Sequence, residues 1–145
     1  VRAVVPPPRG ATIAALERAV AASPDAPAAL AALAQGYLDA ELPGLAVAAV
    51  EGASYGPRGD AEVQHVYARG LLDVGRALGA QSAERAGLAA CEHRGCAPHL
   101  QAGALRRLAF LDRLVAYGVE DPSAEPELCA VAYEASLRDT HLASR

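Results

Sequence analysis

The chain has 145 residues, of which 52% are hydrophobic, so it is long enough and apolar enough to form a folded domain with a sizeable core. Its net charge is -4, and its 13 basic residues are all Arg, spread along the chain without a basic stripe. We therefore expect no nucleic-acid binding. Because no apolar run reaches the roughly 18 residues of a membrane helix, we also expect no membrane insertion.

The apolar residues favour helices over strands. Aromatic residues make up only 4% of the chain, so Ala, Leu and Val must build the core, and Ala and Leu are good helix formers. No run of β-branched residues indicates a strand. We predict an all-α fold of about six helices in antiparallel pairs. The absence of Lys and Asn beside abundant Ala, Arg and Gly is typical of GC-rich coding sequences and favours a bacterial source.

Residues 1–11 are predicted to be a proline-rich arm or linker, and residues 12–145 a single helical domain. Pro6-Pro7-Pro8 favours an extended conformation in the arm. Thr12 is a suitable N-cap for the first helix, and Ser23-Pro24-Asp25 is expected to end that helix and to cap the next. The buried stripe of the first helix is predicted to contain Ile13, Leu16, Ala19 and Val20.

The stretch from Ala28 to Pro57 reads as one complete helix–turn–helix unit. Spacings of three and four residues place Leu30, Leu33 and Tyr37 on one face of its first helix, and we expect Leu33 and Tyr37 to be buried between helices. A break follows at residues 41–44. The second helix has a face of small and apolar residues, Ala46, Val50 and Ala53, and Gly56-Pro57 ends it.

This unit resembles a tetratricopeptide repeat, a helix–turn–helix of about 34 residues. The residues that carry the resemblance are Leu30, Leu33-Ala34, Tyr37, Ala46, Val50 and Ala53. A shift of one repeat length toward the N-terminus gives a second match, with Leu16, Ala19 and Pro24 at the positions of Val50, Ala53 and Arg58. The resemblance implies helix pairs stacked as a short right-handed solenoid. The alternative is an ordinary Ala-rich helical bundle.

Two further helix pairs are predicted after this unit. Apolar periodicity indicates a helix over 61–78, with Asp60 as its N-cap and Gly79 as its stop. Its partner helix is predicted over 82–93, and this pair departs from the repeat spacing. The last pair is predicted to begin with a helix over 98–117, in which Leu105 is expected to widen the buried stripe and Gly118 is the stop. Asp121-Pro122-Ser123 is expected to start the final helix.

The resemblance also implies a function, because tetratricopeptide proteins bind peptides in a concave groove lined by the first helix of each pair. We therefore expect a non-catalytic scaffold that binds a protein or peptide. Arg69, Arg106 and Arg113 are expected to approach one surface and to pair with carboxylates of an acidic partner. The predicted groove residues are Gln35, Leu38, Asp39, Glu62, His65, Arg69, Asp73, Arg106, Arg113 and Tyr117.

A cluster of Cys and His residues gives the main alternative. Cys91, His93, Cys96 and His99 lie within nine residues and include ligand types that zinc prefers, although their spacing is not that of a known finger. A metal- or redox-responsive domain is therefore one alternative, and a self-associating module that forms homo-oligomers is another. A disulfide between two of Cys91, Cys96 and Cys129 is a further alternative, but we expect free thiols and solvated His side chains.

No arrangement of nucleophile and base is visible, and there is no glycine-rich phosphate-binding motif. We expect no enzymatic activity and no cofactor.

Overall fold

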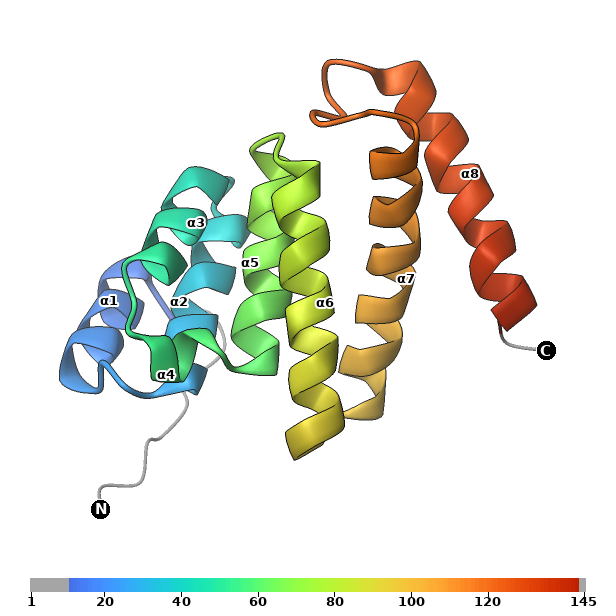
Figure 1. The fold of residues 1–145 in the computed structure, drawn as a ribbon. Coiled ribbons are helices and arrows are strands. Elements are labelled where there is room, and N and C mark those ends of the chain that lie inside the picture. The colour runs from blue at the N-terminus through green and yellow to red at the C-terminus, as the bar shows by residue number, and fades with distance from the viewer. Residues whose placement is uncertain (1–10, 144–145) are drawn as a thin grey trace.

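The computed structural model describes residues 11–143, and within this range the chain forms eight helices and no strand (Figure 1). The predicted all-α class is confirmed, with more helices than the six or so expected. The predicted arm, except for Ala11, lies outside the described residues. The helices are α1 (Ile13–Ala22), α2 (Pro27–Asp39), α3 (Pro43–Glu51), α4 (Tyr55–Arg58), α5 (Ala61–Asp73), α6 (Ala77–Arg94), α7 (Pro98–Ala116) and α8 (Pro126–Ala143).

Side chains cap two helix starts as predicted. The Thr12 hydroxyl accepts a hydrogen bond from the Ala15 amide, and the Asp60 carboxylate accepts from the first amides of α5. Asp25, in contrast, does not cap α2. Its carboxylate accepts a hydrogen bond from the Ser54 hydroxyl, and α2 begins after Ala26 without a side-chain cap. Proline in the first turn of α2, α3 and α7 suits these starts, because the first amides of a helix have no partner within it.

The same turn ends α2, α5 and α7. In each, the second residue after the last helical residue has a positive φ, namely Glu41 (60°), Gly75 (83°) and Gly118 (74°). The next amide donates to the carbonyl five residues earlier at 2.8 to 2.9 Å, from Leu42 to Tyr37, Arg76 to Leu71 and Val119 to Leu114. This closing bond defines a Schellman motif, in which glycine is favoured at the left-handed position. Glu41 adopts that conformation despite its side chain.

The turn at Gly75 corrects the predicted boundaries of the third helix pair. The first helix of that pair ends at Asp73 and the second begins at Ala77, because the chain reverses at Gly75 and Gly79 lies inside α6. As a result, the starts of α5 and α6 follow those of α2 and α3 by the same interval, which is one repeat length. The predicted departure from the repeat spacing is therefore wrong for these helices.

Two other boundaries differ from the prediction. The glycine- and proline-rich segment after α3 forms the single-turn helix α4, whose Pro57 is buried. The last helix begins at Pro126 and not after residues 121–123. Asp121 forms a local turn instead, because its carboxylate accepts hydrogen bonds from both the amide and the hydroxyl of Ser123.

Helices α5, α6 and α7 stand side by side, with α2 and α3 on one flank and α8 on the other (Figure 1). Helix α5 packs against both α2 and α3, whereas α7 makes its main contacts with α6 and α8. A regular stack of helix pairs would also place α7 against α5, so the packing of the last pair differs from that of the preceding ones.

The core consists mainly of Ala, Leu and Val, as the composition predicts. One cluster joins α1, α2, α3 and α5, and a second extends from α3 to α8. Leu33 and Tyr37 were predicted to be buried, and only 6% and 9% of their surfaces are exposed. The Tyr37 hydroxyl donates a 2.7 Å hydrogen bond to Glu17 of α1, and this bond raises the pKa of Tyr37.

The buried position of Leu33 gives a stability prediction. Leu33→Ala should lower the free energy of unfolding by about 2–5 kcal/mol, because it leaves a cavity in the first cluster. Leu45 of α3 is a matched control, since it is 48% exposed, and Leu45→Ala should change stability by less than about 0.5 kcal/mol. Urea unfolding followed by circular dichroism measures both values. Equal losses in the two variants would contradict the assignment of the core.

Candidate functional site

Three of the predicted groove residues form a polar row across α2 and α5. Arg69 of α5 donates a 2.7 Å hydrogen bond to the Gln35 side chain of α2, and Gln35 donates to Asp39 at 2.8 Å. Gln35 and Arg69 are 34 residues apart, and each is the ninth residue of its helix. Of the other predicted groove residues on these helices, Leu38 is half-buried, whereas Glu62 and Asp73 are exposed.

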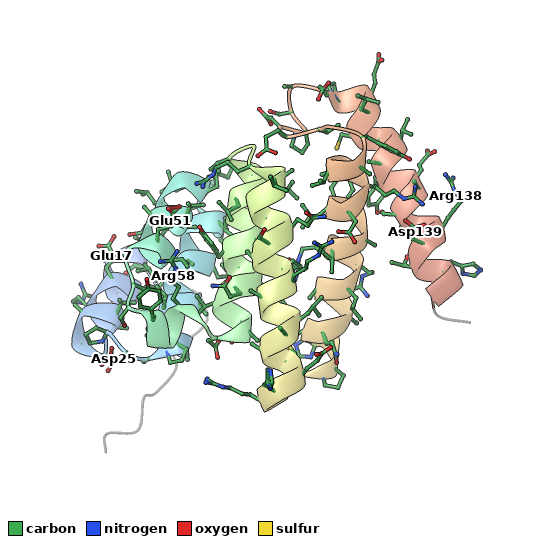
Figure 2. The ribbon with its side chains drawn as sticks, viewed as in Figure 1. Glu17, Asp25, Glu51, Arg58, Arg138 and Asp139 are labelled. Carbon is green, nitrogen blue, oxygen red and sulfur yellow. A yellow bond between two sulfur atoms is a disulfide. The ribbon has the colours of Figure 1, made fainter. Side chains whose placement is uncertain are left out.

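The predicted arginines do not gather on one surface. Arg69 lies at the α2–α5 contact, whereas Arg106 and Arg113 lie where α7 faces α8. The Arg113 guanidinium forms two 2.7 Å hydrogen bonds with Asp139 of α8, which is labelled in Figure 2. Tyr117, the exposed C-cap of α7, follows Arg113 by about one helical turn. Arg106 is exposed and forms no ion pair or hydrogen bond with the part of the chain described by the structure.

His65 is the clearest correction among the predicted groove residues. Only 1% of its surface is exposed, so its side chain lies inside the packed helices. Its Nδ1 atom lies 2.5 Å from a carboxylate oxygen of Glu84 on α6. The contact is close enough for an ion pair, but the ring nitrogen lacks a hydrogen bond of good geometry. His65 is thus unavailable to a partner that binds at the surface.

Glu84 links three helices through charge. Its side chain is fully buried, and the Arg107 guanidinium of α7 donates to its two oxygens at 3.1 and 3.4 Å. A buried carboxylate is costly unless it is paired, and Glu84 has His65 on one side and Arg107 on the other. We call these three residues the buried charge cluster. Glu84 is the eighth residue of α6, and the eighth residue of α3 is the apolar Val50.

A glycine makes room for the imidazole ring. A Cβ atom added at Gly87 would lie 2.5 Å from Cε1 and 2.6 Å from Nδ1 of His65. Any larger residue at this point of α6 would therefore displace the ring. Glu84 and Gly87 are separated by three residues, and Cys91 follows four residues later, so this face of α6 meets His65 over two turns.

Cys91 and Cys96 form a disulfide, so the favoured expectation of free thiols is wrong for these two residues. Cys129 of α8 is a free, half-buried cysteine. The disulfide joins α6 to the loop before α7. Zinc is bound by thiolates, and disulfide sulfurs are not thiolates, so this form of the protein does not offer the predicted Cys ligands. The described residues contain no group of three or more potential metal ligands.

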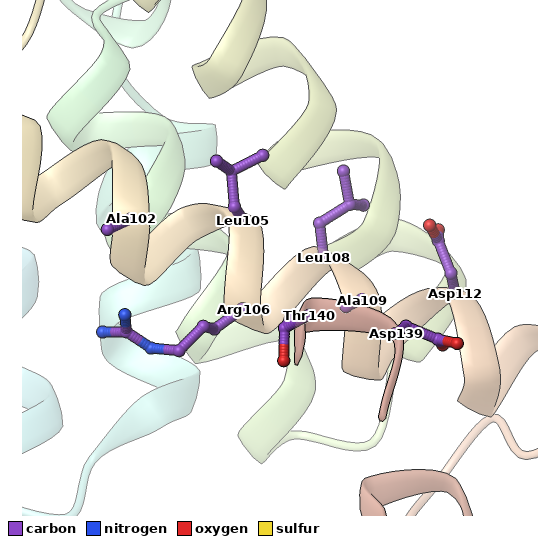
Figure 3. A pocket seen from close by; sticks show the side chains of 8 residues that line it. All are labelled: Ala102, Leu105, Arg106, Leu108, Ala109, Asp112, Asp139 and Thr140. Carbon is purple, nitrogen blue, oxygen red and sulfur yellow. The ribbon is translucent and has the colours of Figure 1, made fainter. Parts of the chain in front are cut away.

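An apolar cleft of about 590 Å³ lies between α7 and α8 (Figure 3). The sequence did not predict this cleft, because Leu105 was expected to widen the buried stripe of its helix; it is 51% exposed instead. Figure 3 shows Arg106 on one side of the cleft and Asp112 and Asp139 on the other. The lining residues are Ala102, Leu105, Arg106, Leu108, Ala109, Asp112, Asp139 and Thr140.

The acidic residues of the cleft already have partners. Asp112 accepts a 2.7 Å hydrogen bond from Gln81 and pairs with Arg85, both on α6. Asp139 is held by Arg113. Arg106 is therefore the charged residue of the cleft that remains available to a ligand.

Comparisons with protein-family models, curated proteins and solved structures give no match for this chain. Among residues 11–143, no helix is both long enough and apolar enough to cross a membrane.

The contact between Gly87 and His65 predicts opposite effects for two glycine substitutions. Gly87→Ala should destabilise the protein by about 1–3 kcal/mol, because the new methyl group overlaps the imidazole ring. Gly103→Ala in α7 is the control. There the methyl group meets only the ends of Arg107 and Arg106 at 3.5 and 3.8 Å, and helix propensity favours Ala by up to about 1 kcal/mol. Thermal unfolding should rank Gly103→Ala above Gly87→Ala; the reverse order would contradict the packing.

The pair between α7 and α8 predicts a pH effect. Hydrogen bonds from Arg113 lower the pKa of Asp139, and Arg138 lowers it further through its charge. A lowered pKa stabilises the fold above the unfolded value of about 3.9, and this contribution is lost as the pH falls through the folded value. Nuclear magnetic resonance titration of the Asp139 carboxyl should show a higher midpoint in Arg113→Gln and a smaller rise in Arg138→Gln. An unchanged midpoint in Arg113→Gln would exclude the pair in solution.

Proposed function

We propose that this chain is a non-catalytic, tetratricopeptide-like helical scaffold that binds a peptide segment of another protein. The equivalent bounds of α2 and α5, their shared closing turn and the Gln35–Arg69 bond between equivalent positions support a repeat. The different packing of α7 and α8 suggests that the last pair serves another purpose than extending the stack.

The observation that carries the proposal is the apolar cleft beside Arg106, which has no partner among the described residues. Leu105, Leu108 and Ala109 supply an apolar lining, and an exposed guanidinium at the edge supplies one strong donor group. This arrangement suits a ligand that carries apolar side chains and a carboxylate. We propose a peptide with apolar side chains and an Asp, Glu or C-terminal carboxylate as the ligand.

Exposed apolar side chains continue beyond the cleft and favour a peptide over a small molecule. Leu137 and Tyr133 of α8 are about half exposed, and with Arg106 they line a second hollow of about 190 Å³. A peptide that fills the cleft would extend over this neighbouring surface, whereas a small ligand would not reach it. The polar row of Gln35, Asp39 and Arg69 is a less favourable place, because its side chains already satisfy one another.

A random peptide library displayed on phage tests this proposal against the immobilised chain. The selected peptides should combine apolar residues with a carboxylate. Leu105→Glu and Arg106→Ala should each weaken binding of a selected peptide by about tenfold or more. Leu105→Glu places a negative charge where it repels the peptide carboxylate, and Arg106→Ala removes the guanidinium that would bind that carboxylate. Affinities are measured by fluorescence anisotropy at two salt concentrations, because screening should weaken the contact with Arg106.

Two matched variants separate the cleft from the rest of the surface. Leu78→Glu changes a 55% exposed leucine of α6, and Arg18→Ala removes an exposed arginine of α1 far from the cleft. Both should leave the affinity unchanged. Selected peptides that bind Leu105→Glu and Arg106→Ala as tightly as the native chain would place the binding surface elsewhere, and the polar row would then be next to test.

A further inference from the structure

Cys91, His65 and Glu84 form a continuous row inside the protein. The Cys91 sulfur lies 3.9 Å from Nε2 of His65, and Nδ1 of the same ring faces Glu84 at 2.5 Å. A sulfur, an imidazole and a carboxylate in this order are the parts of a thiol–base–acid triad. Because Cys91 is bonded to Cys96, the imidazole sits beside one sulfur of a disulfide.

We infer that the Cys91–Cys96 disulfide is a redox-active site, in which a dithiol reductant attacks Cys96 and His65 delivers a proton to the departing Cys91 sulfur. This inference does not depend on peptide binding in the cleft, because it rests on α5, α6 and the loop before α7.

Exposure decides which sulfur is attacked. Cys91 is 5% exposed and lies on the inner face of α6, whereas Cys96 is half-buried in the loop that follows Gly95. Thiol–disulfide exchange requires access to one sulfur and a stabilised leaving group at the other. Cys96 meets the first requirement, and Cys91 beside His65 meets the second.

Reduction of the Cys91–Cys96 disulfide proceeds through a mixed disulfide between Cys96 and the reductant. A thiolate of the reductant bonds to the Cys96 sulfur, the Cys91–Cys96 bond breaks, and its electron pair goes to Cys91. His65 in its imidazolium form gives its Nε2 proton to that sulfur and later regains a proton from solvent. The second thiolate of the reductant then attacks the mixed disulfide and releases Cys96 as a thiolate. The protein gains two electrons, and the reductant becomes a disulfide.

Reduction removes the covalent link between α6 and the α6–α7 loop. Gly95 has a φ of 76°, and α7 begins only two residues after Cys96. Without this cross-link, only the peptide backbone and noncovalent contacts hold the segment that leads into α7. The redox state of the disulfide thus controls how firmly the start of α7 is attached to α6.

Trapping of the intermediate tests the direction of attack in the native chain. The oxidised protein is treated with reduced glutathione, quenched in acid and alkylated under denaturing conditions. Peptide mass spectrometry should then find glutathione on Cys96 and the alkyl group on Cys91, with the free Cys129 alkylated throughout as a reference. Glutathione on Cys91, with Cys96 alkylated, would overturn the inference.

Reduction rates test the role of His65. With dithiothreitol at fixed pH, His65→Asn should slow reduction by about 100-fold, the lower end of the range for proton transfer by a positioned side chain. The control is Val63→Ala, which removes packing from the same helix in the first core cluster. Simple loosening of the fold exposes the disulfide, so this control should be reduced as fast as the native chain or faster. Equal or faster reduction of His65→Asn would refute proton delivery.

Glu84 is a positioning residue in this scheme, and its test is a double-mutant cycle. Glu84→Gln should slow reduction in the native background but cause no additional slowing in His65→Asn. Additive slowing in the two variants would show that Glu84 does not act through the ring. If His65→Asn loses its helical spectrum, the inference is tested by the reduction rate of Glu84→Gln and by the trapping experiment. A reduction rate of Glu84→Gln equal to that of the native chain would contradict the inference.

Discussion

The burial of one carboxylate determines how the centre of this protein is assembled. Glu84 has no exposed side-chain surface, so its charge requires partners from the helices around it. His65 comes from α5 and Arg107 from α7, and the three groups together fix the relative positions of α5, α6 and α7. Gly87 is part of the same arrangement, because the imidazole occupies the space that a side chain would fill.

The sequence was sufficient to predict the fold class and much of the first unit. Helix periodicity, the caps at Thr12 and Asp60, and the burial of Leu33 and Tyr37 all follow from residues close together in the chain. The boundary between α5 and α6 was missed, because Val74 continues the apolar pattern past the true end of α5 and Gly75 ends it only through its backbone conformation. Periodicity alone does not decide which of two nearby glycines reverses the chain.

The candidate sites depended on contacts that no local pattern contains. Arg106 and Arg107 are adjacent in sequence but diverge around the helix, so one faces solvent at the cleft and the other reaches Glu84. Arg113 is two turns beyond Arg106 and meets Asp139. His65 looked like a surface residue, since its position was offset from the apolar stripe of its own helix. Its burial is compensated by Glu84, and a pattern along one helix cannot show a partner supplied by another.

The attachment of α8 has a consequence for adaptability. This helix packs mainly on α7, and several of its larger apolar side chains remain in contact with solvent. A helix that packs on one neighbour buries less surface than a helix enclosed on both sides, so we expect α8 to open locally at a lower free-energy cost than α7. One wall of the cleft therefore lies on the less firmly packed helix α8, and the other lies on α7, which packs against both α6 and α8. For the proposed peptide ligand, small shifts of α8 would let the cleft accept side chains of different sizes, while the buried charge cluster holds α7 against α6.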